Sequence, residues 1–458
     1  MIWLYGLSRK PFLISDLRGC TKLARRLEFL PPPMIVREVF DNGLRLITEA
    51  MPHVRSISLG VWIARGSRHE DPGQSGISHF IEHMLFKGSA SRSAQEIAQA
   101  IDSIGGQVDA FTAKEYAGYY VKVLDTHLPA AFDILSDLIL HPSFREKDIE
   151  REKKVVLEEI KMVEDTPDDL IHELFMQEFW EDHALGRPIL GAPNVVSTFT
   201  SDELRGFFEQ AYIAPNVVVS AAGNLEHPQL RSLVEAAFGD LPATGAPVSW
   251  VQPATMPQIH LRNKDLEQSH ICVGTAAYPQ DHPDRYTSYL MNTILGGSMS
   301  SRLFQHIREE RGLAYAVSSG LNVYRDTGAL VVYAGCATNS VAQVLDLVVD
   351  EMRALADTAV PAAELQRAKD HLKGSLMLSL ESTSSRMSHL AGQELYLGKQ
   401  VGLDETLESI DRVTIGDLQR ISRDLLVDSP RAVTVLGPST GLDLSAERLG
   451  VGVATVVE

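Results

Sequence analysis

The same order of predicted elements occurs twice along the 458-residue chain, and this repetition constrains the fold more than any other feature. Alternating apolar residues predict strands, and a 3.6-residue period predicts helices. In each half the order is strands, two helices, a strand pair, several helices, a strand and a helix. The two halves repeat at a spacing of about 220 residues, which is too long for a solenoid. We therefore expect two similar α+β domains packed face to face.

The predicted elements define two domains and a connection between them. Strands are expected at 35–40, 44–49, 57–64, 107–112, 116–124, 217–222, 259–262, 269–276, 314–321, 328–336 and 432–436. Helices are expected at 76–86, 94–104, within 127–212, and at 228–238, 285–295, 301–309 and 340–424. Residues 241–257 are rich in proline, alanine and threonine and lack periodicity, which is typical of a linker. The expected domains are therefore 34–240 and 258–458.

Residues 1–33 differ in composition from the rest of the chain. Six basic residues stand against two acidic ones, and the segment ends in three consecutive prolines. The apolar residues precede the basic ones, which is the reverse of a secretory signal. We expect a disordered or artefactual extension. A mitochondrial transit peptide and a translation start at Met34 are the alternatives.

The composition excludes several classes of protein. Hydrophobic residues make up 44% of the chain and charged residues 22%, which excludes wholesale disorder. Three scattered cysteines exclude a disulfide framework and a cysteine-based zinc finger. The net charge of −18 repels phosphate backbones, so we expect no nucleic-acid partner. No apolar run reaches about 18 residues, so we expect no membrane insertion.

The segment His79-Phe80-Ile81-Glu82-His83 has the pattern H-x-x-E-H. At about 100° per residue on a helix, the two histidines and Glu82 fall within about 100° of one another, opposite the apolar side chains. Histidines at positions i and i+4 are one turn apart, so both can reach one zinc ion at about 2.0–2.1 Å. Glu82 lies beside them, where it can hold water at the metal. Plain solvation of a polar helix face is the alternative explanation.

A catalytic zinc site needs a third protein ligand and an open position. The predicted helix at 145–164 contains the candidates Glu146, Glu150, Glu152, Glu158, Glu159 and Glu164. Helical periodicity places Glu152 and Glu159 on the buried apolar stripe, whereas Glu158 faces water. Burial disfavours an unpaired carboxylate, so we expect Glu159 to be the third ligand and Glu152 to support the site. A charged helix held by salt bridges is the alternative.

With these residues the chain resembles the insulinase/pitrilysin family of zinc peptidases, the inverzincins, which includes the β-subunit of mitochondrial processing peptidase and its bacterial homologues. The resemblance covers about residues 34–440. The matching segments are 66–70 (GSRHE), 76–88 (GISHFIEHMLFKG), 106–112 (GQVDAFT), 119–120 (YY), 150–160 (EREKKVVLEEI), 296–304 (GGSMSSRLF) and 307–315 (IREERGLAY). The family uses the spacing of 76 residues between His83 and Glu159 for its glutamate ligand.

The resemblance implies two homologous domains, each a mostly antiparallel β-sheet packed with helices, that face each other as a clamshell. It implies that His79, His83 and Glu159 hold Zn2+. The metal would polarise the scissile carbonyl, and Glu82 would take the proton of the attacking water and deliver it to the leaving amine. Glu152 matches a further functional glutamate of the family.

The second domain is expected to be an inactive copy, because its equivalent stretch, 287–292, lacks the H-x-x-E-H pattern. The resemblance implies that this domain contributes Arg308 and Tyr315, which would fix the substrate and stabilise the oxyanion when the halves close. It also implies that a substrate pairs as an extra strand with the segment Gln107, Val108, Asp109, Ala110, Phe111 and Thr112. An acidic run at 164–173 either attracts basic substrate residues or is a solvated face.

We therefore expect a zinc-dependent endopeptidase that cleaves peptides or unfolded, presequence-like polypeptides. A non-catalytic core or peptide-binding subunit of a heterodimeric processing complex is the alternative, and a hydrolase of another substrate with the same metal chemistry is a third. We expect a peptide substrate, and a homodimer or a heterodimer with a related subunit. The expected location is the bacterial cytoplasm, with the mitochondrial matrix as the alternative.

Overall fold

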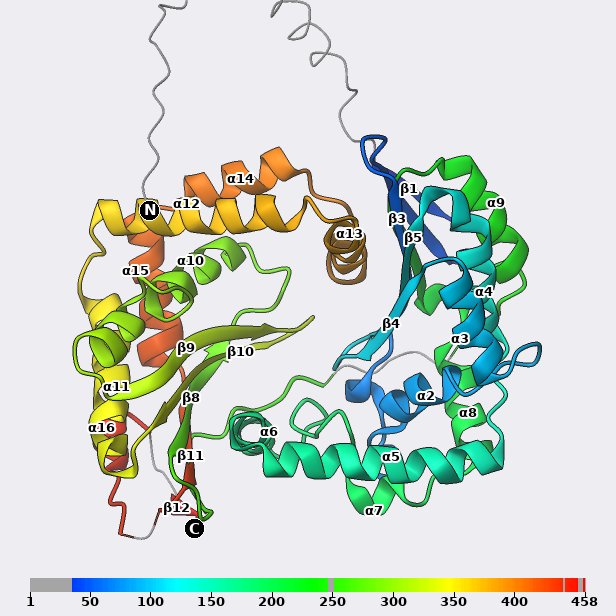
Figure 1. Cartoon of the computed structure of the whole chain (residues 1–458). Helices are drawn as coiled ribbons and strands as arrows, with labels where there is room; N and C mark the ends of the chain where they lie inside the picture. The colour runs from blue at the N-terminus through cyan, green and yellow to red at the C-terminus, as the bar shows by residue number, and fades with distance from the viewer. Residues whose placement is uncertain (1–34, 246–250, 440, 452–455, 458) are drawn as a thin grey trace, which may run out of the picture.

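Two six-stranded sheets organise the chain, and each is accompanied by helices (Figure 1). The computed structural model describes residues 35–245, 251–439, 441–451 and 456–457. The predicted extension at 1–33 and residues 246–250 of the predicted linker lie outside the described residues. The described chain is an α+β protein of two halves that face each other, which confirms the predicted fold class.

The first sheet has the strand order β1-β2-β6-β3-β5-β4. Its strands are β1 (Ile35–Val39), β2 (Arg45–Ala50), β3 (Ser56–Ile63), β4 (Gln107–Thr112), β5 (Ala117–Leu124) and β6 (Val217–Gly223). Neighbouring strands are antiparallel except for β2 and β6, which are parallel. Every residue of β6 is buried, as expected for a continuous run of small and β-branched residues in a central strand.

The helices of the first half follow the predicted order. They are α2 (Ile77–Leu85), α3 (Ala94–Ser103), α4 (Leu128–Leu140), α5 (Glu146–Asp165), α6 (Pro167–Phe179), α7 (Pro193–Val196), α8 (Ser201–Ala211) and α9 (His227–Phe238), with short 3-10 turns η2 (Ser67–His69), η3 (Pro72–Gln74), η4 (Asp125–His127) and η5 (Ala214–Asn216). Capping boxes begin two of them: Ser93 with Glu96 starts α3, and Thr200 with Glu203 starts α8.

The second half contains the other sheet and a longer set of helices. Its strands are β7 (Ile259–Asn263), β8 (Ser269–Ala277), β9 (Ala314–Val323), β10 (Gly328–Cys336), β11 (Arg431–Gly437) and β12 (Val456–Val457). Its helices are α10 (Arg285–Leu295), α11 (Val341–Asp357), α12 (Ala362–Ser379), α13 (Thr383–Leu397), α14 (Leu403–Arg412), α15 (Ile415–Arg423) and α16 (Ala446–Leu449), with the 3-10 turn η7 (Thr338–Ser340) and the π-helical turns η6 (Phe304–Glu309) and η8 (Asp424–Asp428). The helix predicted at 301–309 is thus largely a π-helical turn.

The two sheets share one topology. The second sheet has the order β12-β7-β11-β8-β10-β9, so that β7, β11, β8, β10 and β9 occupy the places of β2, β6, β3, β5 and β4. The parallel pair β2/β6 is repeated as β7/β11. The outermost strands differ: β1 is antiparallel to its neighbour and precedes it, whereas β12 is parallel and comes from the end of the chain. The internal duplication therefore extends to strand order and direction.

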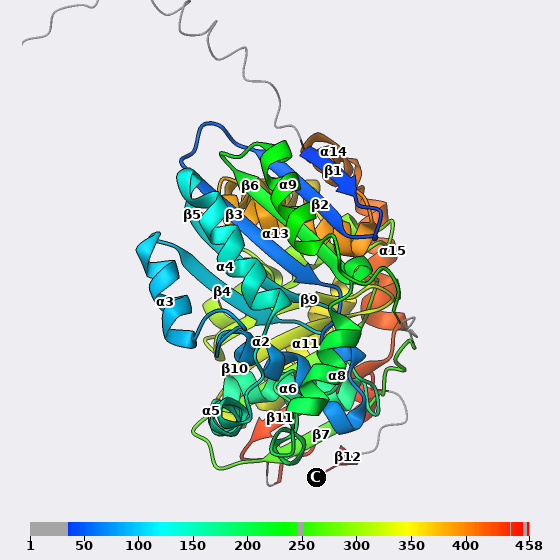
Figure 2. The ribbon, with the colours of Figure 1, turned by 90° about the vertical axis from the view of Figure 1, so that its right-hand side faces the viewer.

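Each half places one helix against the sheet of the other half. Helix α6 packs on β8 and β11, and helix α13 packs on β2, β3 and β6 (Figure 1). Figure 2 shows α13 behind the first sheet, whose near face is covered by α4 and α9. The apolar interface around α6 includes Ile171, Phe175, Cys272, Val331 and Ala432. The interface around α13 includes Ile47, Trp62, Val218, Met387 and Leu390. The halves therefore share two apolar interfaces in addition to their own cores.

Among the described residues, none of the helices combines the length and apolar character that a membrane span requires.

Candidate metal centre

Helix α2 carries the two histidines, and buried groups hold its first turn in place. The carboxylate of Glu70 accepts hydrogen bonds from the backbone N–H groups of Gly76, at 2.7 Å, and Ser78, at 2.8 Å. These N–H groups lack partners within the helix, and its positive end favours a carboxylate. Burial raises the pKa of Glu70 to about 7. Gly76 has a φ of +95°, and a Cβ there would lie 2.6 Å from the carbonyl oxygen of Leu190.

The apolar face of α2 fixes the direction of its polar face. Five apolar side chains of this helix are fully buried in the core of the first half: Ile77, Phe80, Ile81, Met84 and Leu85. With that face in the core, His79 and His83 point toward α5, which packs against α2. The predicted grouping of the imidazoles is therefore present in the structure.

Three donor atoms converge between α2 and α5. The Nε2 atoms of His79 and His83 are 3.2 Å apart, and Oε2 of Glu159 lies 3.7 Å from the first and 3.5 Å from the second. Two atoms that each lie about 2.0–2.1 Å from one tetrahedral zinc ion are separated by about 3.3 Å. Within the described residues these three form the group that could hold a metal ion. The donor set therefore fits zinc in both chemistry and spacing.

Glu152 orients one of the imidazoles. Its Oε1 lies 2.9 Å from Nδ1 of His83, and its Oε2 lies 2.8 Å from Nζ of Lys87. With Nδ1 donating to Glu152, Nε2 of His83 presents its lone pair to the metal position, an arrangement common among histidine ligands. The expectation that Glu152 supports the site agrees with this contact. Its role in catalysis stays a prediction.

The pKa values of the two histidines are shifted in opposite directions. Burial, reinforced by the neighbouring His83, lowers the pKa of His79 to about 3, so this imidazole is neutral at physiological pH. Burial also lowers the pKa of His83, but the hydrogen bond and charge of Glu152 outweigh it and the net pKa is raised. A metal ion therefore competes with a proton at His83, and metal binding should weaken as the pH falls.

Glu82 lies next to the donors and has its own partner. The hydroxyl of Thr112, the last residue of β4, donates a 2.6 Å hydrogen bond to Oε2 of Glu82. Burial raises the pKa of Glu82, and the Thr112 hydrogen bond opposes the rise. A carboxyl group whose pKa is shifted toward neutrality is suited to accept and return a proton. The sequence prediction assigned Thr112 to the substrate strand and did not anticipate this contact.

The predicted burial of Glu159 is wrong. Its side chain is 40% exposed, whereas that of Glu152, on the same face of α5, is 5% exposed. Helical periodicity places both residues on one stripe, but Glu152 is paired with both His83 and Lys87, whereas Glu159 faces the two histidines and keeps part of its surface open. One carboxylate is therefore enclosed, and the other remains accessible for a ligand and a substrate.

Strand β4 lies at the edge of the first sheet and is paired on one side by β5. An edge position is what pairing with a further strand requires, and the role of this segment in substrate binding stays a prediction. Beyond Thr112, a cavity of about 750 Å³ extends between the halves. Its lining comes from the β4–β5 turn, from α6 and from β9 and β10, and includes Tyr116, Glu173, Asn322 and Tyr333.

Arg308 and Tyr315 contact each other in the second half. The guanidinium of Arg308 lies 5.0 Å from the ring centre of Tyr315 and 4.7 Å from that of Phe304. Tyr315 is 79% exposed and lies near the start of β9, whereas the other end of β9 approaches the first half. Among the described residues, no hydrogen bond or ion pair joins this pair to the three donors. Their contribution to the site stays a prediction.

Sequence reasoning missed the residues that position the motif rather than belong to it. Glu70 holds the first turn of α2, Lys87 shares Glu152 with His83, and Thr112 holds Glu82. Glu70 and Lys87 lie within the matched segments 66–70 and 76–88, which gave a local signal. Their partners were not evident, because each contact depends on how loops and strands meet in the fold.

Family models match two adjoining parts of the chain. The model described as insulinase (peptidase family M16) matches residues 45–193, and the model described as the peptidase M16 inactive domain matches residues 198–372. Curated relatives align over most of their length. The chain is 43% identical over 406 residues to the uncharacterized zinc protease YmxG of Bacillus subtilis, covering 89% of this chain and 99% of that protein. It is 40% identical over 428 residues to an uncharacterized zinc protease of Streptomyces coelicolor, covering 91% and 92%.

Solved structures share the fold. A crystal structure described as the peptidase M16 inactive domain from Pseudomonas fluorescens aligns with a TM-score of 0.83 at 22% identity, over 88% of this chain and 98% of that one. A protease from Helicobacter pylori aligns with a TM-score of 0.83 at 21% identity, over 89% and 100%. At these identities the likeness shows a common architecture and nothing about activity.

Proposed function

Since the chain belongs to the insulinase family, peptidase family M16, we propose that it is a zinc-dependent endopeptidase that cleaves peptides or unfolded, presequence-like polypeptides. The observation that carries the proposal is the convergence of two imidazole nitrogens and one carboxylate oxygen at separations of 3.2–3.7 Å. Three protein donors with an accessible remaining position are typical of catalytic rather than structural zinc.

Each residue of the site has a role in this proposal. When bound, zinc supplies a Lewis acid that polarises a carbonyl group and makes water a nucleophile near neutral pH. His79, His83 and Glu159 would hold the ion, and Glu152, through its hydrogen bond to Nδ1 of His83, would keep the Nε2 lone pair directed at it. Glu82 accepts a proton from the attacking water and returns it to the leaving amine.

The edge strand suggests how a peptide binds. A substrate that pairs with β4 would be held mainly through backbone hydrogen bonds, which demand little of its sequence. Such a strand would run past Thr112, which contacts Glu82, and so past the candidate metal position. Arg308 and Tyr315, from the second half of the same chain, would reach the substrate when the halves close. The proposal also includes a dimer, formed with a second copy of this chain or with a related subunit.

Metal content and peptide cleavage, measured together, test the proposal. Wild type and Glu82→Gln would be assayed for zinc and for hydrolysis of a quenched fluorescent peptide library. We expect about one zinc per chain in both proteins, with cleavage by Glu82→Gln slower than by the wild type by at least about 10²-fold. Turnover by Glu82→Gln at the wild-type rate would contradict the mechanism. Zinc without cleavage in the wild type would favour the peptide-binding subunit, and absence of zinc would contradict the metal centre.

A further inference from the structure

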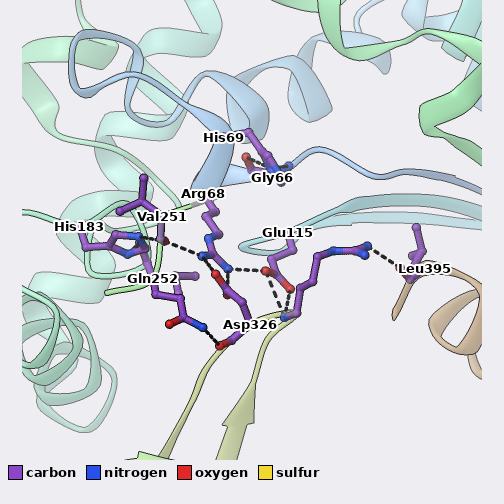
Figure 3. Close-up of polar contacts among 11 residues, drawn as sticks. Gly66, Arg68, His69, Glu115, His183, Val251, Gln252, Asp326 and Leu395 are labelled. Carbon is purple, nitrogen blue, oxygen red and sulfur yellow. Dashed lines mark hydrogen bonds and ion pairs between the residues drawn. The ribbon is translucent and has the colours of Figure 1, made fainter. Parts of the chain in front are cut away.

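Arg68 joins the two halves of the molecule and the segment that connects them (Figure 3). Its Nη1 donates to Oε1 of Glu115 at 2.7 Å and to Oδ1 of Asp326 at 2.6 Å. Its Nη2 donates to Oδ2 of Asp326 at 2.7 Å and to the carbonyl oxygen of Val251 at 3.0 Å. Glu115 belongs to the β4–β5 turn and Asp326 to the β9–β10 turn, so one guanidinium links both sheets.

Further bonds surround this ion-pair cluster. The backbone N–H of Arg325 donates to Oε2 of Glu115 at 3.0 Å, and its Nη2 donates to the carbonyl oxygen of Leu395, near the end of α13, at 2.6 Å. The side chain of Gln252 donates to the carbonyl oxygen of Asp326 at 3.0 Å. The β9–β10 turn is therefore held from the first half, from the connecting segment and from α13.

The ion-pair cluster is buried, so its charges depend on one another for compensation. The side chains of Arg68 and Glu115 are each 4% exposed, and that of Asp326 is 17% exposed. Burial lowers the pKa of Arg68, but its hydrogen bonds to Asp326 and Glu115 outweigh this effect and the net pKa is raised. Loss of one partner would leave the remaining charges incompletely paired in a poorly solvated site.

The backbone of Ser67 and Arg68 is hydrogen-bonded to the residues that directly follow β4. The N–H of Ser67 donates to the carbonyl oxygen of Ala113 at 3.2 Å, and the N–H of Arg68 donates to that of Lys114 at 2.7 Å. A Cβ on Gly66 would lie 2.2 Å from the carbonyl oxygen of Ala113, so the two segments touch. Ala113 directly follows Thr112, whose hydroxyl holds Glu82.

We propose that Arg68 and Asp326 are positioning residues, which clamp the β4–β5 turn to the β9–β10 turn and thereby place Thr112 against Glu82. The inference rests on the proposed peptidase function. It ties the contact between the halves to the orientation of the proton-transferring carboxylate. A simple interdomain tie would support folding alone, whereas this clamp acts on turnover.

A second interdomain ion pair provides the matched control. Glu394 on α13 accepts from Nε and Nη2 of Arg37 on β1 at 2.8 and 2.9 Å, and its side chain is fully buried. The pair crosses between the halves as Arg68–Asp326 does, but β1 lies at the opposite edge of the sheet from β4. Asp326→Asn and Glu394→Gln remove one charge each with little change in shape.

The experiment measures zinc content, kcat and KM on a quenched peptide, and hydrogen exchange of the peptide amides in 107–117. For Asp326→Asn we expect unchanged zinc, faster exchange in the turn, and kcat reduced roughly 10- to 100-fold with a smaller effect on KM. Glu394→Gln should leave exchange in 107–117 and kcat close to wild type. Asp326→Glu, which keeps the charge, should retain more activity than Asp326→Asn.

A double-mutant cycle with Thr112→Val separates positioning from a structural role. If Asp326 acts through Thr112, Asp326→Asn should have little further effect on kcat in the Thr112→Val protein. Fully additive effects, or equal losses in Asp326→Asn and Glu394→Gln, would overturn the inference. Should the wild type cleave no peptide, the proposed function fails by itself. Hydrogen exchange then still decides whether Asp326 orders the β4–β5 turn, and unchanged exchange in Asp326→Asn would overturn the clamp.

Discussion

The helix that follows β3 and the equivalent helix that follows β8 carry different side chains in the two halves. In the first half, α2 presents His79 and His83 to Glu159 of α5. In the second half, α10 meets α12 around a small cavity whose lining includes Thr293 and Ala368. This lining also includes Glu364 and His371, but within the described residues it is only in the first half that three such donor atoms converge. Since the fold does not require imidazoles at this position, their presence in the first half is better explained by chemistry than by packing.

The exchanged helices α6 and α13, unlike α2 and α10, make similar contacts in the two halves. Helix α6 covers the second sheet with Phe175 and Phe179, and helix α13 covers the first sheet with Met387 and Leu390. The two apolar contacts are alike in kind, and each contributes to the burial that holds the halves together. The scaffold is therefore nearly symmetric, while the site chemistry is confined to one half.

Loss of a donor should have the largest effect, because it removes the feature that distinguishes the halves. In His83→Ala we expect zinc to fall from about one per chain to a trace, with peptide cleavage abolished. The matched control is His371→Ala, on α12 at the small cavity between α10 and α12 in the second half, which should retain zinc and activity. Metal analysis after dialysis measures both. Retention of a full zinc equivalent by His83→Ala would place the metal elsewhere.

Substitution of the proton-transferring carboxylate, Glu82, should have the second-largest effect. We expect Glu82→Gln to keep its zinc and to lower kcat by about 10²- to 10⁴-fold, because the amide cannot accept the proton. Glu158→Gln is the control: this exposed residue of α5 forms a surface ion pair with Lys161, and its loss should change kcat little. Equal rates for wild type and Glu82→Gln would remove Glu82 from the mechanism.

The apolar interfaces of α6 and α13 predict similar losses of stability when either one is disrupted. We expect Phe175→Ala and Leu390→Ala each to reduce the free energy of unfolding by about 2–5 kcal/mol, since each opens a cavity in a shared interface. Denaturant unfolding, followed by fluorescence and by circular dichroism, measures the loss. Coincident transitions would show that the halves unfold as one unit. Separate transitions for the two halves would contradict the cooperative contribution of the exchanged helices.

Loss of the carboxylate that supports His83 should have the smallest effect of these four substitution tests. We expect Glu152→Gln to weaken zinc binding about 10- to 100-fold, because it loses the charge that orients His83. Glu394→Gln, which removes an equally buried carboxylate from the second half, should bind zinc as wild type does. A competition titration with a zinc chelator compares the three proteins. Identical affinities would show that Glu152 serves folding rather than the metal.

Much of the scaffold was predictable because it depends on neighbouring residues. The strands at 107–112 and 328–336 were predicted with the bounds that the structure shows. The grouping of His79, Glu82 and His83 followed from the period of one helix. The exposure of Glu159 was predicted wrongly, because a helical period identifies a face but not how far along that face another element covers it.

The sequence alone therefore determined the duplicated α+β architecture, the family resemblance and the residues offered as metal ligands, since strand alternation, helix period and local spacing are properties of the chain itself. Only the tertiary structure decided that α6 and α13 exchange sheets, that Thr112 holds Glu82, and that Arg68 reaches Asp326, which lies 258 residues away. Such contacts arise from the packing of surfaces distant in sequence, and no local pattern encodes which buried charge or hydroxyl will meet which partner.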